Sequence, residues 1–264
     1  MKLISSRDNP LFKHLRALLE DARARREEGA SIIDGEHLLE AAIDAHWHIR
    51  RLIVQESVGA AAAERWLVAI QRQGLIAPEV ISFSDALFRQ LSPVMTPTGF
   101  LAEIAVAGPV PEELHDGDVL VLAGIQDAGN LGSLMRSAVA AGIRQVWLDR
   151  QCTQPWSPKA LRAGMGAQFH LSIREGCDLP ALLAADARPV AVTSLGQGCR
   201  DLYELDLRSP HLWVFGSEGQ GVPAQIVSLA DIKVRIPMAG NIESLNVGAA
   251  AAICLFEQLR QRQG

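Results

Sequence analysis

Three short segments of the sequence combine glycine with polar side chains that could act on a bound ligand. The first runs from Asn130 to Arg136 (NLGSLMR), and the second from Gly216 to Pro223 (GSEGQGVP). The third, IESLNVG, contains Ser244 and Asn246. Together they offer amides, a guanidinium, a carboxylate, a hydroxyl and accessible backbone, which can orient a ligand and stabilise charge. Such a set favours a transfer reaction in which a cofactor carries the reactive group.

Signatures of several other classes of site are missing. The sequence contains no GxSxG nucleophile motif and no P-loop. Gly216, Gly219 and Gly221 have the spacing GxxGxG, whereas dinucleotide-binding folds use GxGxxG, so a nicotinamide site has little support. The cysteines are Cys152, Cys177, Cys199 and Cys254. They form no CxxC pair and do not cluster with histidine, so we expect reduced thiols and no metal.

Each of the three segments follows an apolar run that is predicted to form a strand. The runs DVLVLAG, QVWLD, PVAVT, LWVFG and IKVRIP are short and separated by helical stretches. Near-continuous Val, Leu and Ile are typical of strands buried on both faces of a parallel sheet. Ligands of such sheets bind beyond the carboxyl ends of the strands, where these three segments would lie. Residues 118–264 are therefore predicted to form a doubly wound α/β domain.

Residues 1–107 show a second, smaller alternation of strands and helices. Strands are predicted at 31–35, 51–55, 80–83 and 100–106, and helices at 10–26, 37–45, 60–71 and 85–90. Asn9 is a plausible N-cap for the first helix, with Pro10 at its first position. The polar segment 108–117, GPVPEELHDG, is the predicted linker between two domains.

The composition is that of an ordinary globular chain. Of 264 residues, 48% are hydrophobic and 21% charged, which excludes a disordered or collagen-like protein. No signal-peptide core is present, and the longest apolar stretch, 247–256, is too short to span a membrane, so we expect a cytoplasmic protein. The net charge of −5 argues against nucleic acid, yet residues 2–26 carry a local charge of +4. That strip is either a solvated helix face or a phosphate contact.

In this order, the three segments resemble the motifs of the SpoU (TrmH-type) RNA ribose 2′-O-methyltransferases of the SPOUT superfamily. NLGSLMRSAVAAG resembles the first motif, VFGSEGQGVP the second and IPMAGNIESLNVGAAAAICLFE the third. The front of the chain, with SRDNPLFKHLRALL and GEHLLEAA, is similar to the L30e-like RNA-binding domain that often precedes this catalytic domain. The resemblance implies a C-terminal Rossmann-like parallel sheet with a deep trefoil knot. It also implies S-adenosylmethionine as cofactor and a homodimer with the active site near the subunit interface.

The resemblance also implies roles for individual residues. The catalytic set would be Asn130, Arg136, Glu218, Ser244 and Asn246. The cofactor would be held by Thr193, Leu195, Gly216, Glu218, Gly221, Ile236, Met238, Ser244 and Leu245. RNA would contact Arg7, Lys13, Arg16 and Arg136, together with the arginines near 23–26. The sequence departs from the family pattern at Ala128, Ser137 and Gly164, where proline, threonine and serine are common.

The expected chemistry is methyl transfer to a ribose 2′-hydroxyl. This hydroxyl is a poor nucleophile while protonated, so the enzyme must place it in line with the methyl group and assist proton removal. A guanidinium stays protonated, with a pKa above about 12. We therefore expect Arg136 to bind RNA phosphate and to stabilise negative charge on the 2′-oxygen. Asn130, Ser244 and Asn246 would orient loops or ribose, and Glu218 would hold its loop or Arg136.

Alternatives to this reading stay open at the level of the sequence. Ribosomal RNA is favoured over transfer RNA because of the L30e-like front domain, but the methylated nucleotide is not identified. A non-catalytic RNA-binding or assembly protein on the same fold would lack cofactor binding. A nicotinamide oxidoreductase would need a glycine fingerprint after the first strand of the domain, which DAGNLG does not supply.

Overall fold

The protein was analysed as a computed structural model that describes residues 2–92, 94, 96–106, 116–196, 198–240 and 244–263. Contacts between Cα atoms divide the chain into two compact units. The first contains residues 1–108 and 156–169, and the second contains 109–155 and 170–264. The chain therefore passes between the units three times. Residues 107–115, which include most of the predicted linker, lie outside the described residues.

The first unit is built on a five-stranded mixed sheet. Its strand order is β1 (Lys2–Ile4), β4 (Glu79–Phe83), β3 (Ile49–Gln55), β5 (Phe100–Ala105) and β2 (Ala30–Asp34). β1, β4 and β3 are parallel, and β5 runs antiparallel to both β3 and β2. The accompanying helices are α1 (Pro10–Glu20), α2 (Ala22–Glu28), α3 (Glu36–Asp44), α4 (Gly59–Arg72) and α5 (Asp85–Leu91).

The N-terminal helix begins as predicted but ends earlier. The Asn9 side chain accepts a hydrogen bond from the Leu11 N–H at 2.9 Å, and Pro10 is the first helical residue. The prediction of one helix over 10–26 is wrong because Asp21 is extended and caps a second helix, α2. Arg25 of α2 is buried, and its guanidinium donates to the carbonyls of Leu18 and Leu19 at the end of α1. Arg25 thus completes the helix terminus.

Residues 156–169 belong to the first unit although they lie far along the sequence. They include α7 (Pro158–Gly164), which packs on β2, and most of a short 3-10 turn (Ala167–His170). The Trp47 ring stacks on Trp156 and contacts Phe169, with centroid separations of 5.6 and 5.1 Å. The Ser31 hydroxyl donates to the Trp156 carbonyl at 2.5 Å. An aromatic cluster, Trp47–Trp156–Phe169, therefore fixes this segment.

The second unit contains a seven-stranded, all-parallel sheet. The strands are β6 (Val119–Ala123), β7 (Gln145–Asp149), β8 (Ser172–Cys177), β9 (Val190–Thr193), β10 (Arg200–Asp201), β11 (Leu212–Gly216) and β12 (Ile232–Arg235). Their order is β10-β12-β9-β11-β6-β7-β8. The predicted α/β fold with a parallel sheet is confirmed. β8 and β10 were not predicted because both are polar edge strands without a continuous apolar run.

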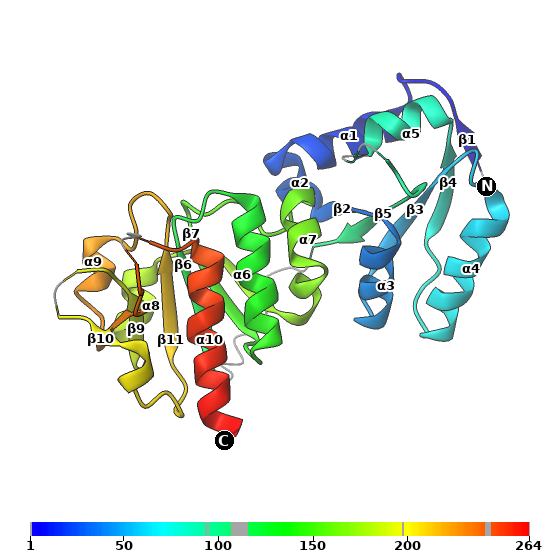
Figure 1. Ribbon diagram of the computed structural model, residues 1–264. Helices are drawn as coiled ribbons and strands as arrows, with labels where there is room; N and C mark the ends of the chain where they lie inside the picture. Colours follow the sequence, from blue (N-terminus) through cyan, green and yellow to red (C-terminus); the bar gives the residue numbers. More distant parts are fainter. Residues whose placement is uncertain are drawn as a thin grey trace. The chain divides into compact units, whose positions relative to one another are not determined.

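Helices cover both faces of this sheet. α8 (Leu179–Ala185) and α9 (Ala224–Val227) pack on one face, where Val121, Val192 and Val214 are buried. α6 (Ala128–Ala140) and α10 (Val247–Gln263) lie side by side in Figure 1 and are in contact. Because β12 lies beyond β9 while α10 contacts α6 and β11, the chain after β12 returns past β9.

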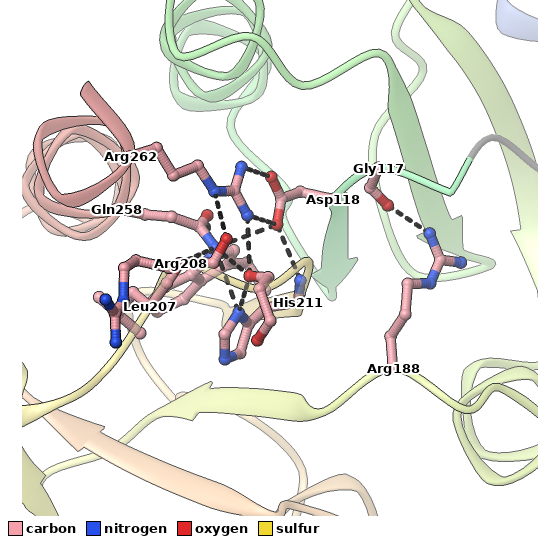
Figure 2. A network of polar contacts seen from close by, with 10 residues as sticks. Gly117, Asp118, Arg188, Leu207, Arg208, His211, Gln258 and Arg262 are labelled. Carbon is pink, nitrogen blue, oxygen red and sulfur yellow. Dashed lines mark hydrogen bonds and ion pairs between the residues drawn. The ribbon is translucent and has the colours of Figure 1, made fainter.

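A polar network holds the C-terminal end of α10 (Figure 2). The buried Asp118 carboxylate accepts from both terminal nitrogens of Arg262 and from the His211 backbone N–H at 2.8 Å. The Trp213 indole donates to Gln258 Oε1 at 2.8 Å, and Gln258 Nε2 donates to the Leu207 carbonyl at 3.0 Å. Burial lowers the pKa of His211. The network therefore ties the last helix to the amino-terminal ends of β6 and β11.

Candidate active site

A cavity of about 540 Å³ lies where the loops after β9, β11 and β12 meet. The beginning of α10 forms a further part of its wall. All nine predicted cofactor residues line it: Thr193, Leu195, Gly216, Glu218, Gly221, Ile236, Met238, Ser244 and Leu245. These residues come from sequence positions up to 52 apart, and the parallel sheet gathers them at the carboxyl ends of its strands.

Glycine is required at one point of this wall by a close approach of the backbone. A Cβ atom on Gly216 would lie 2.1 Å from the carbonyl carbon of Gly221 and 2.3 Å from the Val222 nitrogen. The loop folds back here, with Ser217 and Gly221 forming an antiparallel bridge, and Gly221 has a positive φ of 67°. Gly219 has open space around it. Two of the three glycines in this loop are thus explained by its backbone.

Three polar side chains form a connected chain beside the cavity. Asn246 Nδ2 donates to Asn130 Oδ1 at 3.0 Å, and Asn130 Nδ2 donates to Glu218 Oε1. Glu218 is also part of the cavity wall. The connection spans α6, the loop after β11 and the start of α10. It brings three of the five predicted catalytic residues together.

The structure decides which residues cap the two helices. Asn246 Oδ1 accepts from the N–H groups of Gly248 and Ala249 at 2.9 and 3.3 Å, so Asn246 is the N-cap of α10. Asn130 is not the N-cap of α6, because Asp127 caps this helix and accepts the Asn130 N–H at 2.9 Å. The Asn130 side chain is therefore available to join Asn246 to Glu218.

The other two predicted catalytic residues are placed differently. Ser244 lines the cavity. Arg136 is exposed on α6, six positions beyond Asn130, and no hydrogen bond or ion pair to the described part of the chain is found for it. Glu218 contacts Asn130 rather than Arg136. The guanidinium of Arg136 is thus open to an external anion.

Arg7, Lys13 and Arg16, which are predicted to bind RNA, are exposed, and two of them have local partners. Lys13 lies 3.4 Å from Asp8, and Arg16 pairs with Glu20 at 2.9 Å. Surface pairs of this kind are weak and exchange readily for other anions. Arg7 is exposed and has no ion pair within the described ranges. Arg25 is excluded from the strip because its guanidinium is used inside the unit.

Two further arginines, outside the predicted RNA-binding set, lie beside a buried carboxylate of the first unit. Arg50 and Arg51 follow Ile49, the first residue of β3, and each approaches the buried carboxylate of Glu103 on β5, at 3.8 and 2.6 Å. The sequence shows two adjacent arginines at the start of a predicted strand. It does not show that Glu103 is their buried partner, because β3 and β5 are far apart in the chain and meet only in the sheet.

Burial raises the pKa of both Cys152 and Cys254 to about 12, so these thiols stay protonated. Within the described ranges, no group of three His, Cys, Asp or Glu side chains could hold a metal ion. In the same ranges no helix is long and apolar enough to cross a membrane.

Comparisons with known proteins cover nearly the whole chain. The model of the SpoU rRNA Methylase family matches residues 118–256, and that of the MRM3-like substrate binding domain matches 9–102. An uncharacterized tRNA/rRNA methyltransferase of Synechocystis sp. is 31% identical over 98% of this chain and 94% of its own length. The 23S rRNA (guanosine(2553)-2′-O)-methyltransferase RlmP of Bacillus subtilis is 29% identical over 97% of this chain and 98% of its own.

The solved structures agree with the sequence comparisons. The AdoMet-bound rRNA methyltransferase from Sinorhizobium meliloti superposes with a TM-score of 0.85 at 27% identity. The match covers 98% of this chain and 97% of that one. The family model spans more than half of the chain and includes all three glycine-containing segments. This protein therefore belongs to the SpoU rRNA Methylase family, as the order of its three motifs predicts.

Proposed function

We propose that this protein transfers a methyl group from S-adenosylmethionine to a ribose 2′-hydroxyl of ribosomal RNA. One observation carries the proposal: the nine residues expected to hold the cofactor line a single cavity, and the Asn246–Asn130–Glu218 chain ends at its wall. The similarity to the 23S rRNA 2′-O-methyltransferase RlmP, which covers 97% of this chain, supports the same activity and the same class of RNA.

The residues around the cavity fit S-adenosylmethionine. The volume of about 540 Å³ is within the range of small-molecule sites. Leu195, Ile236 and Met238 offer apolar surface for the adenosine, and Glu218, the acidic residue among the described lining, complements a positively charged ligand. When bound, this cofactor supplies a methyl group on a cationic sulfur. The close backbone approach at Gly216 would hold the loop that covers it.

The polar side chains then act by position and by charge. Asn130 is fixed on both sides, by Asn246 and by Glu218, so it holds the Glu218 carboxylate in one orientation. Arg136 stays protonated and offers a forked donor to an RNA phosphate or to the 2′-oxygen as negative charge develops there. The exposure of Arg136 leaves it open to such an anion.

A homodimer is part of the proposal. α10 exposes the large apolar side chain of Phe256 by 46%, and Leu245, next to its N-cap, is exposed by 39%. Ala249 and Ile253 precede Phe256 at helical spacing and are exposed or half-buried. A second copy covering this face of α10 would remove apolar surface from water close to the cavity. Sedimentation of the protein and of Phe256→Asp tests this, since the variant should sediment as a monomer.

The cytoplasmic location predicted above belongs to the same proposal.

Two measurements test the function. Titration calorimetry with S-adenosylmethionine should show saturable binding to the purified chain. Mapping of 2′-O-methyl groups in RNA from cells with and without the protein should show the loss of a ribosomal site. Absence of cofactor binding would favour the non-catalytic RNA-binding alternative. Loss of a transfer RNA site, with ribosomal RNA unchanged, would contradict the assignment to ribosomal RNA.

A further inference from the structure

The first unit contains a second cavity of about 470 Å³, remote in sequence from the three motifs. It is lined by the first half of α1, the end of α2, the start of β3 and one residue of β5. These residues are Pro10, Leu11, His14, Glu28, Arg50, Arg51 and Glu103. None of them belongs to the candidate active site or to the predicted RNA-binding set.

A buried carboxylate with an unmet hydrogen bond lines this cavity. The Glu103 side chain is 1% exposed, and its Oε2 accepts from Arg51 at 2.6 Å. Its Oε1 has no hydrogen-bond partner in the described residues, although His14 Nε2 lies 3.4 Å and Arg50 Nη1 3.8 Å away. The Nε2 atom of His14 is likewise buried without a hydrogen bond. Buried polar atoms are nearly always paired, so each of these needs an explanation.

Anchoring of α1 does not explain this arrangement. Phe12, Leu15 and Leu18 are almost fully buried and already fix the helix in the core of the unit. A buried ion pair is costly to desolvate and is often replaced by apolar residues without loss of stability. The cluster leaves hydrogen-bonding capacity unused on both a carboxylate and an imidazole. A ligand that supplies a donor to Glu103 would meet that capacity.

The lining selects the chemistry of this ligand. Glu103 offers an acceptor, Arg50 and His14 offer donors beside it, and Pro10 and Leu11 offer apolar surface for a ring. The Watson–Crick edge of guanine presents two donors, N1–H and the 2-amino group, next to the acceptor O6. Adenine presents the N1 acceptor there, which a carboxylate would repel. Proteins read single-stranded RNA through such base edges.

We propose that this cavity binds a guanine base in a single-stranded segment of the RNA substrate. The inference rests on the proposed function for its assumption that RNA is the ligand. The base it reads is additional to the nucleotide that is methylated, because the three motifs lie in the second unit.

Inosine provides a sharp test because it lacks only the 2-amino group of guanosine. The full chain, saturated with S-adenosylmethionine, is titrated by fluorescence anisotropy with short oligouridines that carry one central guanosine, inosine or adenosine. The guanosine oligonucleotide should bind about tenfold more tightly than the other two, as expected for a base edge read by two hydrogen bonds. Equal affinity for guanosine and inosine would overturn the proposal.

Variants assign the preference to the cavity. Glu103→Gln keeps the shape of the side chain and should abolish the discrimination between guanosine and inosine. Arg50→Ala, at a half-exposed position, should weaken binding of the guanosine oligonucleotide. This variant tests the proposal if Glu103→Gln does not fold. Arg72→Ala removes an exposed arginine of α4 outside the cavity and should bind like the parent. Discrimination that persists in the folded Glu103→Gln variant, or an affinity of Arg50→Ala for the guanosine oligonucleotide equal to that of the parent, would refute the assignment.

Cofactor titration and methyl transfer to ribosomal RNA are measured on the same preparations. Their failure would refute the proposed function. Their success without guanine discrimination would refute only the inference about this cavity.

Discussion

Asn246 combines two roles in one side chain, and two substitutions separate them. Its Oδ1 caps α10 through the Gly248 and Ala249 N–H groups, and its Nδ2 donates to Asn130 at 3.0 Å. Aspartate keeps an acceptor oxygen for the cap but has no donor for Asn130, whereas alanine has neither. We therefore expect Asn246→Ala to lower stability and activity, and Asn246→Asp to lower activity alone.

The magnitudes follow from these contacts. Loss of an Asn N-cap costs about 1 kcal/mol. In a chain of this length that lowers Tm by about 2–4 °C. The aspartate variant should keep its Tm, because the helix dipole favours a negative cap. Loss of the hydrogen bond to Asn130 is worth about 0.5–1.5 kcal/mol. If that energy orients Glu218 in the transition state, the rate falls about two- to tenfold.

Thermal unfolding and single-turnover methyl transfer to ribosomal RNA measure the two effects separately. Asp178→Ala is the matched control, because Asp178 caps α8 through Ala181 at 3.2 Å and is not among the residues that line the cavity. That variant should have a lower Tm but methylate at the rate of the parent protein. The reasoning fails if Asn246→Asp lowers Tm as much as Asn246→Ala, or if it methylates at the parent rate.

Three further predictions concern the loop, the arginine and the polar network. Gly216→Ala should abolish cofactor binding in a calorimetric titration, because its Cβ would lie 2.1 Å from the Gly221 carbonyl carbon; parent-like affinity would contradict this loop geometry. Arg136→Lys should lose methyl transfer while cofactor affinity stays, since lysine lacks the forked donor, and retained activity would argue against the role of Arg136. Burial lowers the pKa of His211 below its unfolded value of about 6.5. The unfolded chain therefore binds an extra proton, and stability should fall as pH drops below about 6.5. Urea unfolding should show a smaller fall for His211→Gln, and an identical pH dependence would assign the effect to other groups.

Strands were predictable where burial on both faces forces a continuous apolar sequence. β6, β7 and β11 are of this kind. β8 lies at the edge of the sheet and carries Arg174 and Glu175, so its sequence lacks that signal. The break between α1 and α2 was hidden for a different reason. Asp21 interrupts a stretch of good helix formers, and only its extended backbone reveals that it caps a new helix.

The candidate site was predictable as far as the motifs reach. The resemblance pointed to nine residues that line one cavity, and a parallel sheet brings them together because its loops meet at the carboxyl ends of the strands. Local sequence could not reveal that Asn130 bridges Asn246 and Glu218, because these residues lie in α6, at the start of α10 and in the loop after β11. The cavity around Glu103 escaped for the same reason. Arg51 and Glu103, which both line this cavity, are 52 positions apart in the sequence and meet only through the pairing of β3 with β5.

The aromatic cluster of Trp47, Trp156 and Phe169 limits how the two units can be exchanged between related proteins. Trp47 and the 156–169 segment belong to the same unit, yet the family model that covers the motifs also spans residues 156–169. A fragment cut at residue 117 would carry Trp156 and Phe169 without the ring on which they pack. Replacement of the first unit by that of a related protein would therefore have to include residues 156–169 as well. The two units are thus constrained to change together.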